Sequence, residues 1–248
     1  MIFVYTHMKE KKSIGILGGM GPEATAFMFR LFIQKTQADK DQDHPIIIIY
    51  SNPKTPPRTD AIFKSGEDPV PYLIKGASVL KKSGADIIVM PCITAHYFIK
   101  DVRKKLDFNF ISLVDEAVKW TINRNPDVKR IGLLSSKGTI KARIFHKAFE
   151  KRKINLITPS EKEQKTVMES IFGNRGIKAG HKTGRSRENI LSVAHSLINQ
   201  GAEALITGCT EIPMALKKND INVLYIEPMS ITVTAALKAA GYKIKKNI

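Results

Sequence analysis

Short hydrophobic runs alternate with amphipathic stretches of helical length along most of this chain. The runs lie at residues 14–17, 45–50, 87–90, 130–134, 155–158, 204–207 and 223–226, with a shorter one near 110. Between them, the apolar spacing predicts helices over 24–38, 69–83, 114–123, 162–173, 186–200 and 229–240. Strands that alternate with helices predict parallel sheets and the α/β fold class. The run at 45–50 is so β-branched that we expect a strand covered on both faces, followed by a rigid loop over 51–59.

The second half of the pattern repeats the first. The strand Ile-Gly-Ile-Leu at 14–17 returns as Ile-Gly-Leu-Leu at 131–134, and Gly-Ala-acid followed by a buried-type strand occurs at 84–90 and again at 201–207. We therefore predict two pseudo-symmetric domains, each with a parallel sheet flanked by helices, and an active site in the cleft between them. The expected boundaries are 1–114 plus 223–248 for the first domain and 115–222 for the second.

The only two cysteines, Cys92 and Cys209, follow the two repeated strands, and each has a threonine within two residues. Ligands bind at the carboxyl ends of strands in open α/β sheets. Two thiols that face each other there could move a proton from one face of a carbon to the other. Buried cysteines are often only small hydrophobes, and two cysteines do not make a disulfide scaffold. We favour a functional pair, because a helix start after each strand would lower a thiol's pKa.

The chain carries 40 Lys and Arg against 23 Asp and Glu, a formal charge of +17 over 248 residues. That charge suits an anionic partner, including nucleic acid. However, the lysines are scattered in pairs with few aromatics among them, so we prefer a solvated surface whose field attracts a small dianionic substrate, and we expect no nucleic acid partner. No zinc-ligand spacing occurs, and we expect no bound metal.

We expect a cytoplasmic protein without a membrane span. No apolar run reaches the ~18 residues that a membrane helix needs, and no export signal is visible. Met8, which precedes a charged run and the first strand, is a candidate start, in which case residues 1–7 do not belong to the native protein.

Residues 19–24 (Gly-Met-Gly-Pro-Glu-Ala) match the dinucleotide-binding fingerprint in letter form. We discount that match because no acidic residue ends the second strand to hold a ribose, and because Pro22 removes an amide from the helix start. The remaining amides suit a smaller anion such as a carboxylate.

Three motifs together resemble the aspartate/glutamate racemase family. They are residues 16–25 (Ile-Leu-Gly-Gly-Met-Gly-Pro-Glu-Ala-Thr), 91–96 (Pro-Cys-Ile-Thr-Ala-His) and 208–213 (Gly-Cys-Thr-Glu-Ile-Pro). The resemblance covers about residues 13–240. It implies two pseudo-symmetric α/β domains, no pyridoxal phosphate or other cofactor, and a homodimer. It also implies a two-base reaction in which Cys92 and Cys209 are the catalytic pair, one as thiolate and the other as thiol.

The resemblance further assigns substrate-binding positions. Those positions are Met20, Asn52, Arg58, Ile93, Thr94, Ser136, Thr139, Lys178 and Thr210. Thr94 and Thr210 would hold the α-carboxylate with nearby amides, Met20 and Asn52 would line the pocket, and Ser136 with Thr139 match the family's hydroxyl loop.

Arg58 and Lys178 fall where aspartate racemases carry cations for the distal carboxylate, although both could be ordinary surface cations. We therefore expect aspartate as the first substrate and glutamate as the second. Ile93 departs from the family, which usually has Asn there, so the pocket becomes more apolar and a more hydrophobic amino acid becomes a second candidate substrate. Two further functions stay open: a cysteine-dependent isomerase or decarboxylase of small diacids, and a basic protein that binds an anion without turnover.

Four further residues have open or structural interpretations. His96 suits a packing role and a catalytic role equally well. Glu211 could orient Cys209 or cap a helix, and we slightly favour the cap. Asp86 and Glu203 precede their strands, so we expect both to be structural.

Overall fold

The computed structural model describes residues 11–245, so the candidate start at Met8 lies outside the described residues. In chain order the strands and helices are β1 (Ile14–Gly18), α1 (Pro22–Lys35), η1 (Asp41–Asp43), β2 (Ile47–Ser51), α2 (Arg58–Ile62), α3 (Val70–Lys82), β3 (Ile87–Val89), η2 (Thr94–Phe98), α4 (Ile99–Lys105), α5 (Leu113–Arg124), β4 (Arg130–Leu134), α6 (Lys137–Lys141), α7 (Ile144–Glu150), β5 (Asn155–Ile157), α8 (Glu161–Phe172), η3 (Ile177–Ala179), α9 (Arg185–Asn199), β6 (Ala204–Thr207), α10 (Ile212–Ala215), η4 (Lys218–Asp220), β7 (Leu224–Ile226) and α11 (Pro228–Ala239). The η elements are 3₁₀ helices.

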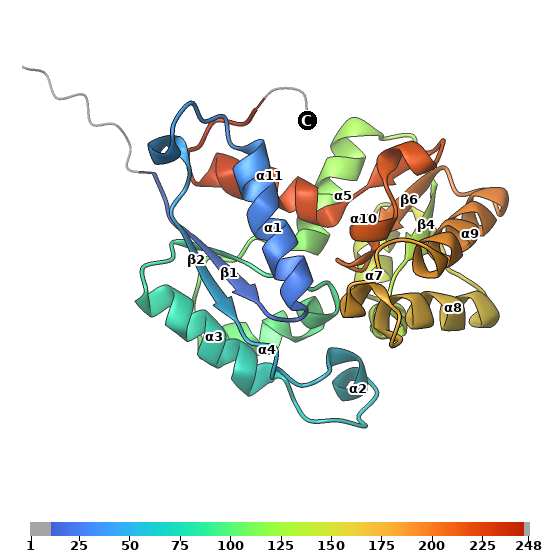
Figure 1. Ribbon diagram of the computed structural model, residues 1–248, viewed down its shortest axis with the longest axis horizontal. Coiled ribbons are helices and arrows are strands. Elements are labelled where there is room, and N and C mark those ends of the chain that lie inside the picture. Colours follow the sequence, from blue (N-terminus) through green and yellow to red (C-terminus); the bar gives the residue numbers. More distant parts are fainter. Residues whose placement is uncertain (1–10, 246–248) are drawn as a thin grey trace, which may run out of the picture.

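The strands form two parallel sheets, each flanked by helices, as the sequence predicts (Figure 1). The first has the order β2-β1-β3 and the second the order β5-β4-β6-β7. A single parallel bridge between Ile88 and Phe110 occupies the place that β7 takes in the second sheet. The two halves therefore share one topology, and the strand expected near Phe110 is reduced to that bridge.

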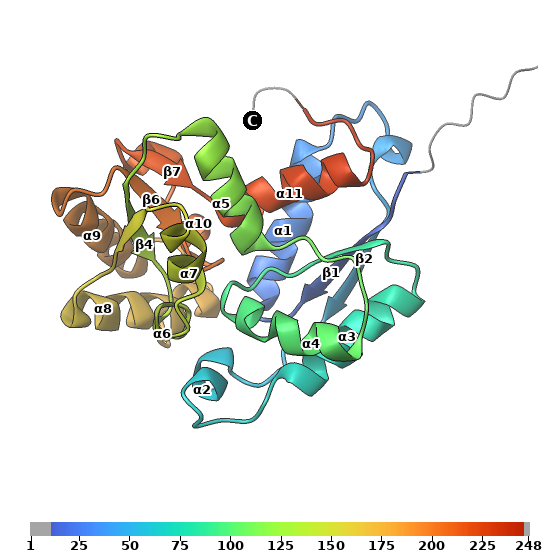
Figure 2. The same ribbon diagram turned by 180° about the vertical axis from the view of Figure 1, so that it is seen from behind.

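The last strand departs from the expected domain boundary. The boundary at 222/223 assigns β7 to the first domain, but β7 pairs with β6 through Leu224, Tyr225 and Ile226 and so belongs to the second sheet. The chain then returns, and α11 packs against α1 and α5 (Figures 1 and 2). The hydrophobic run predicts a strand here, but it does not show which of the two sheets that strand joins.

Equivalent acidic side chains fix the start of the central strands in both halves. The Asp86 carboxylate accepts a hydrogen bond from Ser13 N at 2.8 Å. The Glu203 carboxylate accepts from Lys129 N at 2.7 Å and from Arg130 N at 3.2 Å. These backbone donors lower the pKa of both carboxyl groups. Both acids lie at the amino ends of β3 and β6, so the expected structural role is confirmed.

One apolar core joins the two halves. A single cluster of buried side chains contains Ile16 of β1, Leu133 of β4, Phe145 of α7 and Val233 of α11. Burial of such side chains stabilises each by about 1.5–3 kcal/mol relative to exposure. Because the cluster includes both central strands, the sheets are held in a fixed relation at their junction.

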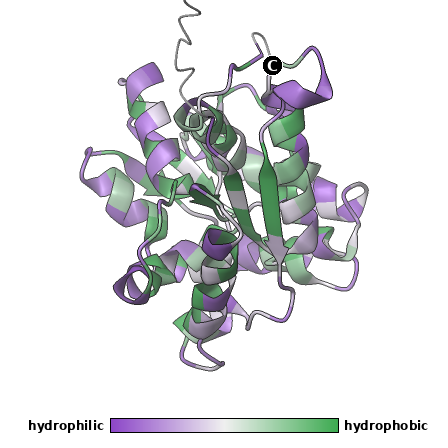
Figure 3. Ribbon diagram, turned by 90° about the vertical axis from the view of Figure 1, so that its left-hand side faces the viewer, coloured by the Kyte–Doolittle hydropathy of each residue, from purple (hydrophilic) through white to green (hydrophobic). Residues whose placement is uncertain are grey.

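Strand β2 lies at the edge of its sheet and is only partly covered, and this exposure corrects the expectation that it is covered on both faces. It pairs only with β1 among the described strands. Ile49 is 41% exposed, and Ile46, just before the strand, is 67% exposed. The strands of the first sheet are hydrophobic along their length (Figure 3), yet the apolar run does not show that one edge stays open. The expected rigid loop over 51–59 likewise ends in a short helix, since α2 begins at Arg58.

No helix within residues 11–245 is both long enough and apolar enough to cross a membrane.

Candidate active site

Both cysteines lie at the carboxyl ends of equivalent strands, where the two halves meet. Cys92 follows β3 and Cys209 follows β6, and both are free thiols, 6% and 7% exposed respectively. The Thr210 hydroxyl donates to the Pro91 carbonyl at 3.2 Å. This hydrogen bond joins the residue after one cysteine to the residue before the other. The structure therefore brings the two cysteine loops together, as the repeated motif predicts.

Three hydroxyl groups from both halves form a cluster beside Cys92. Thr94 Oγ1 lies 3.1 Å from Ser136 Oγ and 2.9 Å from Thr139 Oγ1. Ser136 is also the N-cap of α6 and accepts from the amide of Thr139. Hydroxyls can donate to a carboxylate, so the cluster has the chemistry expected of a site for the α-carboxylate.

A carboxylate and an ammonium group flank Cys209. The Cys209 thiol donates to Glu211 Oε2 at 3.0 Å, and Glu211 forms an ion pair with Lys178. The Glu211 side chain is 2% exposed and makes no capping hydrogen bond to α10, although it stands at the N-cap position. The slightly favoured interpretation of Glu211 as a helix cap is therefore wrong, and its side chain instead orients the thiol.

Burial, and next the Glu211 carboxylate, raise the pKa of Cys209 well above its usual value. The expectation that a helix start lowers the thiol pKa thus fails for this cysteine, because α10 has only four residues and the carboxylate lies closer. Cys209 is consequently a thiol in the unliganded protein.

The Lys178 ammonium is within electrostatic reach of both thiols. Burial lowers the pKa of Lys178, but Glu211, Cys209 and Cys92 outweigh burial and raise the pKa above its usual value. Lys178 therefore stays charged beside both cysteines. Because Lys178 forms an ion pair with Glu211, a substrate carboxylate that binds Lys178 would share the ammonium group with the Glu211 carboxylate.

Two cations from distant parts of the chain converge on the carbonyl of Met20. Arg58 Nη2 donates to that oxygen at 3.1 Å, and Lys178 Nζ lies 3.4 Å from it. Arg58 Nη1 also donates to the carbonyls of Thr55 and Pro56, at 3.0 and 2.9 Å, while its Nε is buried without a partner among the described residues. Arg58 and Lys178 are thus neighbours in the fold and not scattered surface cations.

Asn52 packs closely against the glycine loop. Gly19 has a φ of +90°, and a Cβ there would lie 2.3 Å from the Asn52 backbone nitrogen. Only glycine permits this approach of the two loops. The Asn52 side chain accepts from Lys54 N at 3.0 Å and is half-buried.

Ile93 is 2% exposed and belongs to the buried cluster that joins the halves. An apolar residue at this position therefore satisfies the packing of the junction. Its expected contact with substrate stays a prediction.

His96 holds the first cysteine loop in place. Its Nδ1 lies 2.8 Å from the Cys92 carbonyl, and its Nε2 accepts from Leu113 N at 3.0 Å. A carbonyl only accepts and an amide only donates, so the ring is the neutral Nδ1–H tautomer. Burial lowers the pKa of His96 to about 4. Both ring nitrogens are used, which resolves the two interpretations of His96 in favour of a packing role.

A pH prediction follows from His96 and Glu227. Burial raises the pKa of Glu227, the N-cap of α11, to about 7. Between pH 4.5 and 6.5 the unfolded chain binds a proton at histidine, whereas the folded chain binds one at Glu227. We expect the two slopes to cancel. In His96→Gln only the Glu227 effect remains, so the free energy of unfolding should fall by about 2 kcal/mol as pH rises across this window. In Glu227→Gln only the His96 effect remains, so the free energy of unfolding should rise by about 2 kcal/mol. Urea titrations at several pH values would measure this, and parallel slopes in the two variants would contradict it.

Within residues 11–245, no three or more His, Cys, Asp or Glu side chains come together as a metal site would require. The arrangement is that of a two-half α/β protein with paired thiols, hydroxyls and a buried ammonium at the junction of its strand ends.

Comparison with known proteins identifies the family. The family model for Asp/Glu/hydantoin racemases matches residues 17–236, and the chain belongs to that family. The broad specificity amino-acid racemase RacX of Bacillus subtilis is 28% identical over 207 residues, which span 82% of this chain and 87% of that protein.

Solved structures show the same fold. Aspartate racemase of Picrophilus torridus superposes with a TM-score of 0.83 at 32% identity, covering 95% of this chain and 96% of that one. An aspartate racemase homologue from Pyrococcus horikoshii gives a TM-score of 0.73 at 25% identity, covering 92% and 99%. Glutamate racemase of Francisella tularensis, at 16% identity, covers 92% of this chain and 81% of its own with a TM-score of 0.66, and it supports the fold alone.

Proposed function

We propose that this protein racemises a free acidic amino acid, aspartate first and glutamate second, without a cofactor. The observation that carries the proposal is the pair of thiols on contacting loops, with Lys178 paired to the Glu211 carboxylate that accepts a hydrogen bond from the Cys209 thiol. The likeness to the aspartate racemase of Picrophilus torridus supports the substrate class.

The reaction removes one proton from the α-carbon of the substrate and adds one proton to the opposite face of that carbon. Cys92, as thiolate, removes the α-proton and becomes a thiol, while Cys209, as thiol, gives its proton to the opposite face of the carbanion and becomes a thiolate. Exchange of protons with solvent, or reaction in the other direction, restores the starting form. The raised pKa of Cys209 supports its role as the donor in the resting enzyme.

The carbanion needs fixed positive charge and donors in a dry site. The Lys178 ammonium would supply the charge. Hydroxyls of Thr94 and Thr210 would hold the α-carboxylate, so that the developing negative charge stays between the two sulfurs. Both thiols are almost fully buried, which supports a site from which water is excluded.

Proton exchange at Cα tests the proposal. The purified protein is incubated in D₂O, without added cofactor, with L-aspartate, L-glutamate and a panel of neutral amino acids, and followed by NMR and chiral chromatography. We expect deuterium uptake and the D-enantiomer with aspartate foremost. Exchange with neutral amino acids at equal rates would instead favour a broad-specificity racemase, which Ile93 and the likeness to RacX support. No exchange with any amino acid would contradict racemisation.

Arg58 is expected to select acidic substrates. Replacing Arg58 with alanine should raise KM for aspartate about ten- to hundredfold, because a charge-assisted hydrogen bond is lost. The same change should alter KM for a neutral amino acid much less. Steady-state kinetics on both substrates measures the difference. Equal losses on the two substrates would show that Arg58 only supports the loop through its bonds to Thr55, Pro56 and Met20.

The homodimer, which the resemblance implies, and the cytoplasmic location, which the sequence composition predicts, both stay predictions. Contact of Lys178 with a distal carboxylate is likewise a prediction.

A further inference from the structure

A cavity lies against α6, and its lining is separate from the residues predicted to bind the substrate. It has a volume of about 670 Å³ and is bounded by α6, by the residues after β5 and by α8. Neither cysteine nor any of the predicted substrate-binding residues lines it. A volume of this size is typical of sites for small organic ligands.

Two lysines at this cavity have no counter-charge. Lys137 and Lys141 stand one turn apart on α6, and their ammonium groups lie 5.2 and 5.9 Å from the Phe63 ring centroid. Among the described residues neither forms an ion pair. Like charges at this spacing repel, and an anion between them would relieve the repulsion. Two glutamates, Glu161 and Glu169, also line the cavity. Glu161 is already paired with Lys165.

Gln164 also lines the cavity, and its side chain carries a buried acceptor without a donor among the described residues. Gln164 Nε2 donates to the Ser135 carbonyl at 3.0 Å, and this bond fixes the orientation of the amide. Gln164 Oε1 is buried and has no partner among the described residues. Such an atom is destabilising unless an N–H or O–H group reaches it.

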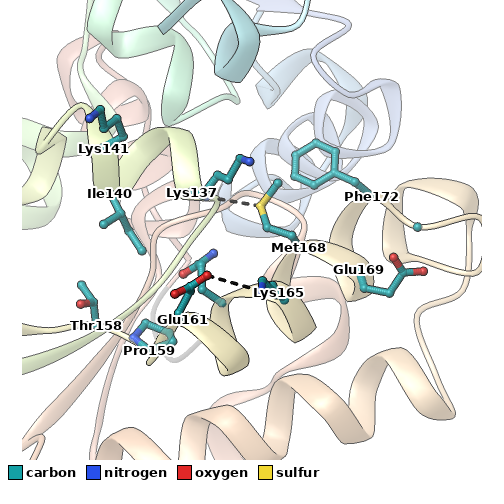
Figure 4. A pocket seen from close by; sticks show the side chains of 12 residues that line it. Lys137, Ile140, Lys141, Thr158, Pro159, Glu161, Lys165, Met168, Glu169 and Phe172 are labelled. Carbon is teal, nitrogen blue, oxygen red and sulfur yellow. Dashed lines mark hydrogen bonds and ion pairs between the residues drawn. The ribbon is translucent and has the colours of Figure 1, made fainter. Parts of the chain in front are cut away.

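Apolar side chains form a further part of the wall. Met168 and Phe172 stand one turn apart on α8, and Ile140 and Pro159 complete the lining (Figure 4). Phe172 is 47% exposed in spite of its size. Its ring also lies 5.5 Å from Lys178 Nζ, so this wall touches the cysteine site through one side chain.

We propose that the cavity binds a small aromatic carboxylic acid that carries an N–H or O–H donor. The carboxylate lies between the ammonium groups of Lys137 and Lys141, the donor reaches Gln164 Oε1, and the ring packs on Met168 and Phe172. Each part of this ligand matches one feature of the cavity wall within the described part of the chain: two lysines without an ion pair, one acceptor without a donor, and an apolar surface.

Three probes test these contacts by calorimetry in the absence of amino acid. Indole-3-acetate has the ring, the carboxylate and the N–H. Indole-3-ethanol lacks the carboxylate, and naphthalene-1-acetate lacks the N–H. We expect indole-3-acetate to bind with Kd below about 1 mM. Each of the other probes should bind at least about tenfold more weakly. Equal binding of all three, or no binding of indole-3-acetate at that concentration, would overturn the proposal.

Two variants locate the site. The double substitution Lys137→Ala/Lys141→Ala should weaken binding of indole-3-acetate at least about tenfold. Lys165→Ala, at the lysine already paired with Glu161, is the matched control and should weaken it less. Saturating aspartate should not displace the probe, and displacement would show that the cavity is part of the substrate site. Because binding is measured without turnover, a failure here leaves the proposed racemisation intact.

Discussion

Replacing either cysteine with alanine should lower the rate of racemisation by about a thousandfold or more. A positioned acid or base contributes about 10²–10⁴-fold, and the reaction needs one of each at the same carbon. In the proposed reaction, Cys92→Ala removes the base and Cys209→Ala removes the proton donor. We expect the appearance of D-aspartate from L-aspartate, followed by chiral chromatography, to be lost in both variants.

The matched control is a change at the other end of the same strands. Asp86→Asn and Glu203→Gln alter acids that fix β3 and β6 at their amino ends, whereas the thiols follow the carboxyl ends of the same strands. They should retain most of the activity. A cysteine variant as active as these controls would show that its thiol is an inert core residue, as buried cysteines often are.

Glu211→Gln should move the alkaline limb of the pH profile of kcat/KM to lower pH and reduce the maximum about ten- to hundredfold. The Glu211 carboxylate accepts the Cys209 thiol at 3.0 Å, and its charge contributes to the raised pKa of that thiol. Without the charge, Cys209 ionises at lower pH and the proton donor is lost sooner. Initial rates from pH 6 to 11 would measure the shift.

Glu203→Gln again serves as control, since it removes a carboxylate at the opposite end of β6 and should leave the limb in place. If the alkaline limb of the kcat/KM profile is unchanged in Glu211→Gln, then Glu211 acts only as the counter-ion of Lys178. Lys178 should then show the larger effect when its own charge is removed.

The alternation of strands and helices could be predicted from the sequence because each period is local. The predicted helix at 162–173 is α8 (Glu161–Phe172), and that at 186–200 is α9 (Arg185–Asn199). Parallel pairing and the internal repeat followed from the same pattern. The open edge of β2 and the pairing of β7 with β6 were not predictable, because both depend on which strands become neighbours in space.

Among the site residues, the cysteine loops came from repeated motifs, and Arg58 and Lys178 came from the resemblance. Their convergence on the Met20 carbonyl is seen only in the structure. The functions of His96 and Glu211 came from neither the motifs nor the resemblance. A histidine that accepts from Leu113 N and a glutamate that accepts from a thiol look the same in the sequence as catalytic or capping side chains. One signal could have favoured Glu211: it stands two residues after a cysteine, at the start of a helix too short to need a cap.

The sequence by itself determined the α/β class, the duplication and the two thiols at equivalent strand ends, because strand period, glycine turns and repeated motifs are properties of neighbouring residues. Only the tertiary structure decided that the thiols' loops touch through Thr210, that burial and a carboxylate raise the pKa of Cys209, and that Lys178 pairs with that carboxylate. The pKa of Cys209 depends on desolvation and on nearby charges. Its carboxylate neighbour Glu211 is two positions away, but Lys178, which pairs with that carboxylate, lies 33 positions before Glu211 in the chain.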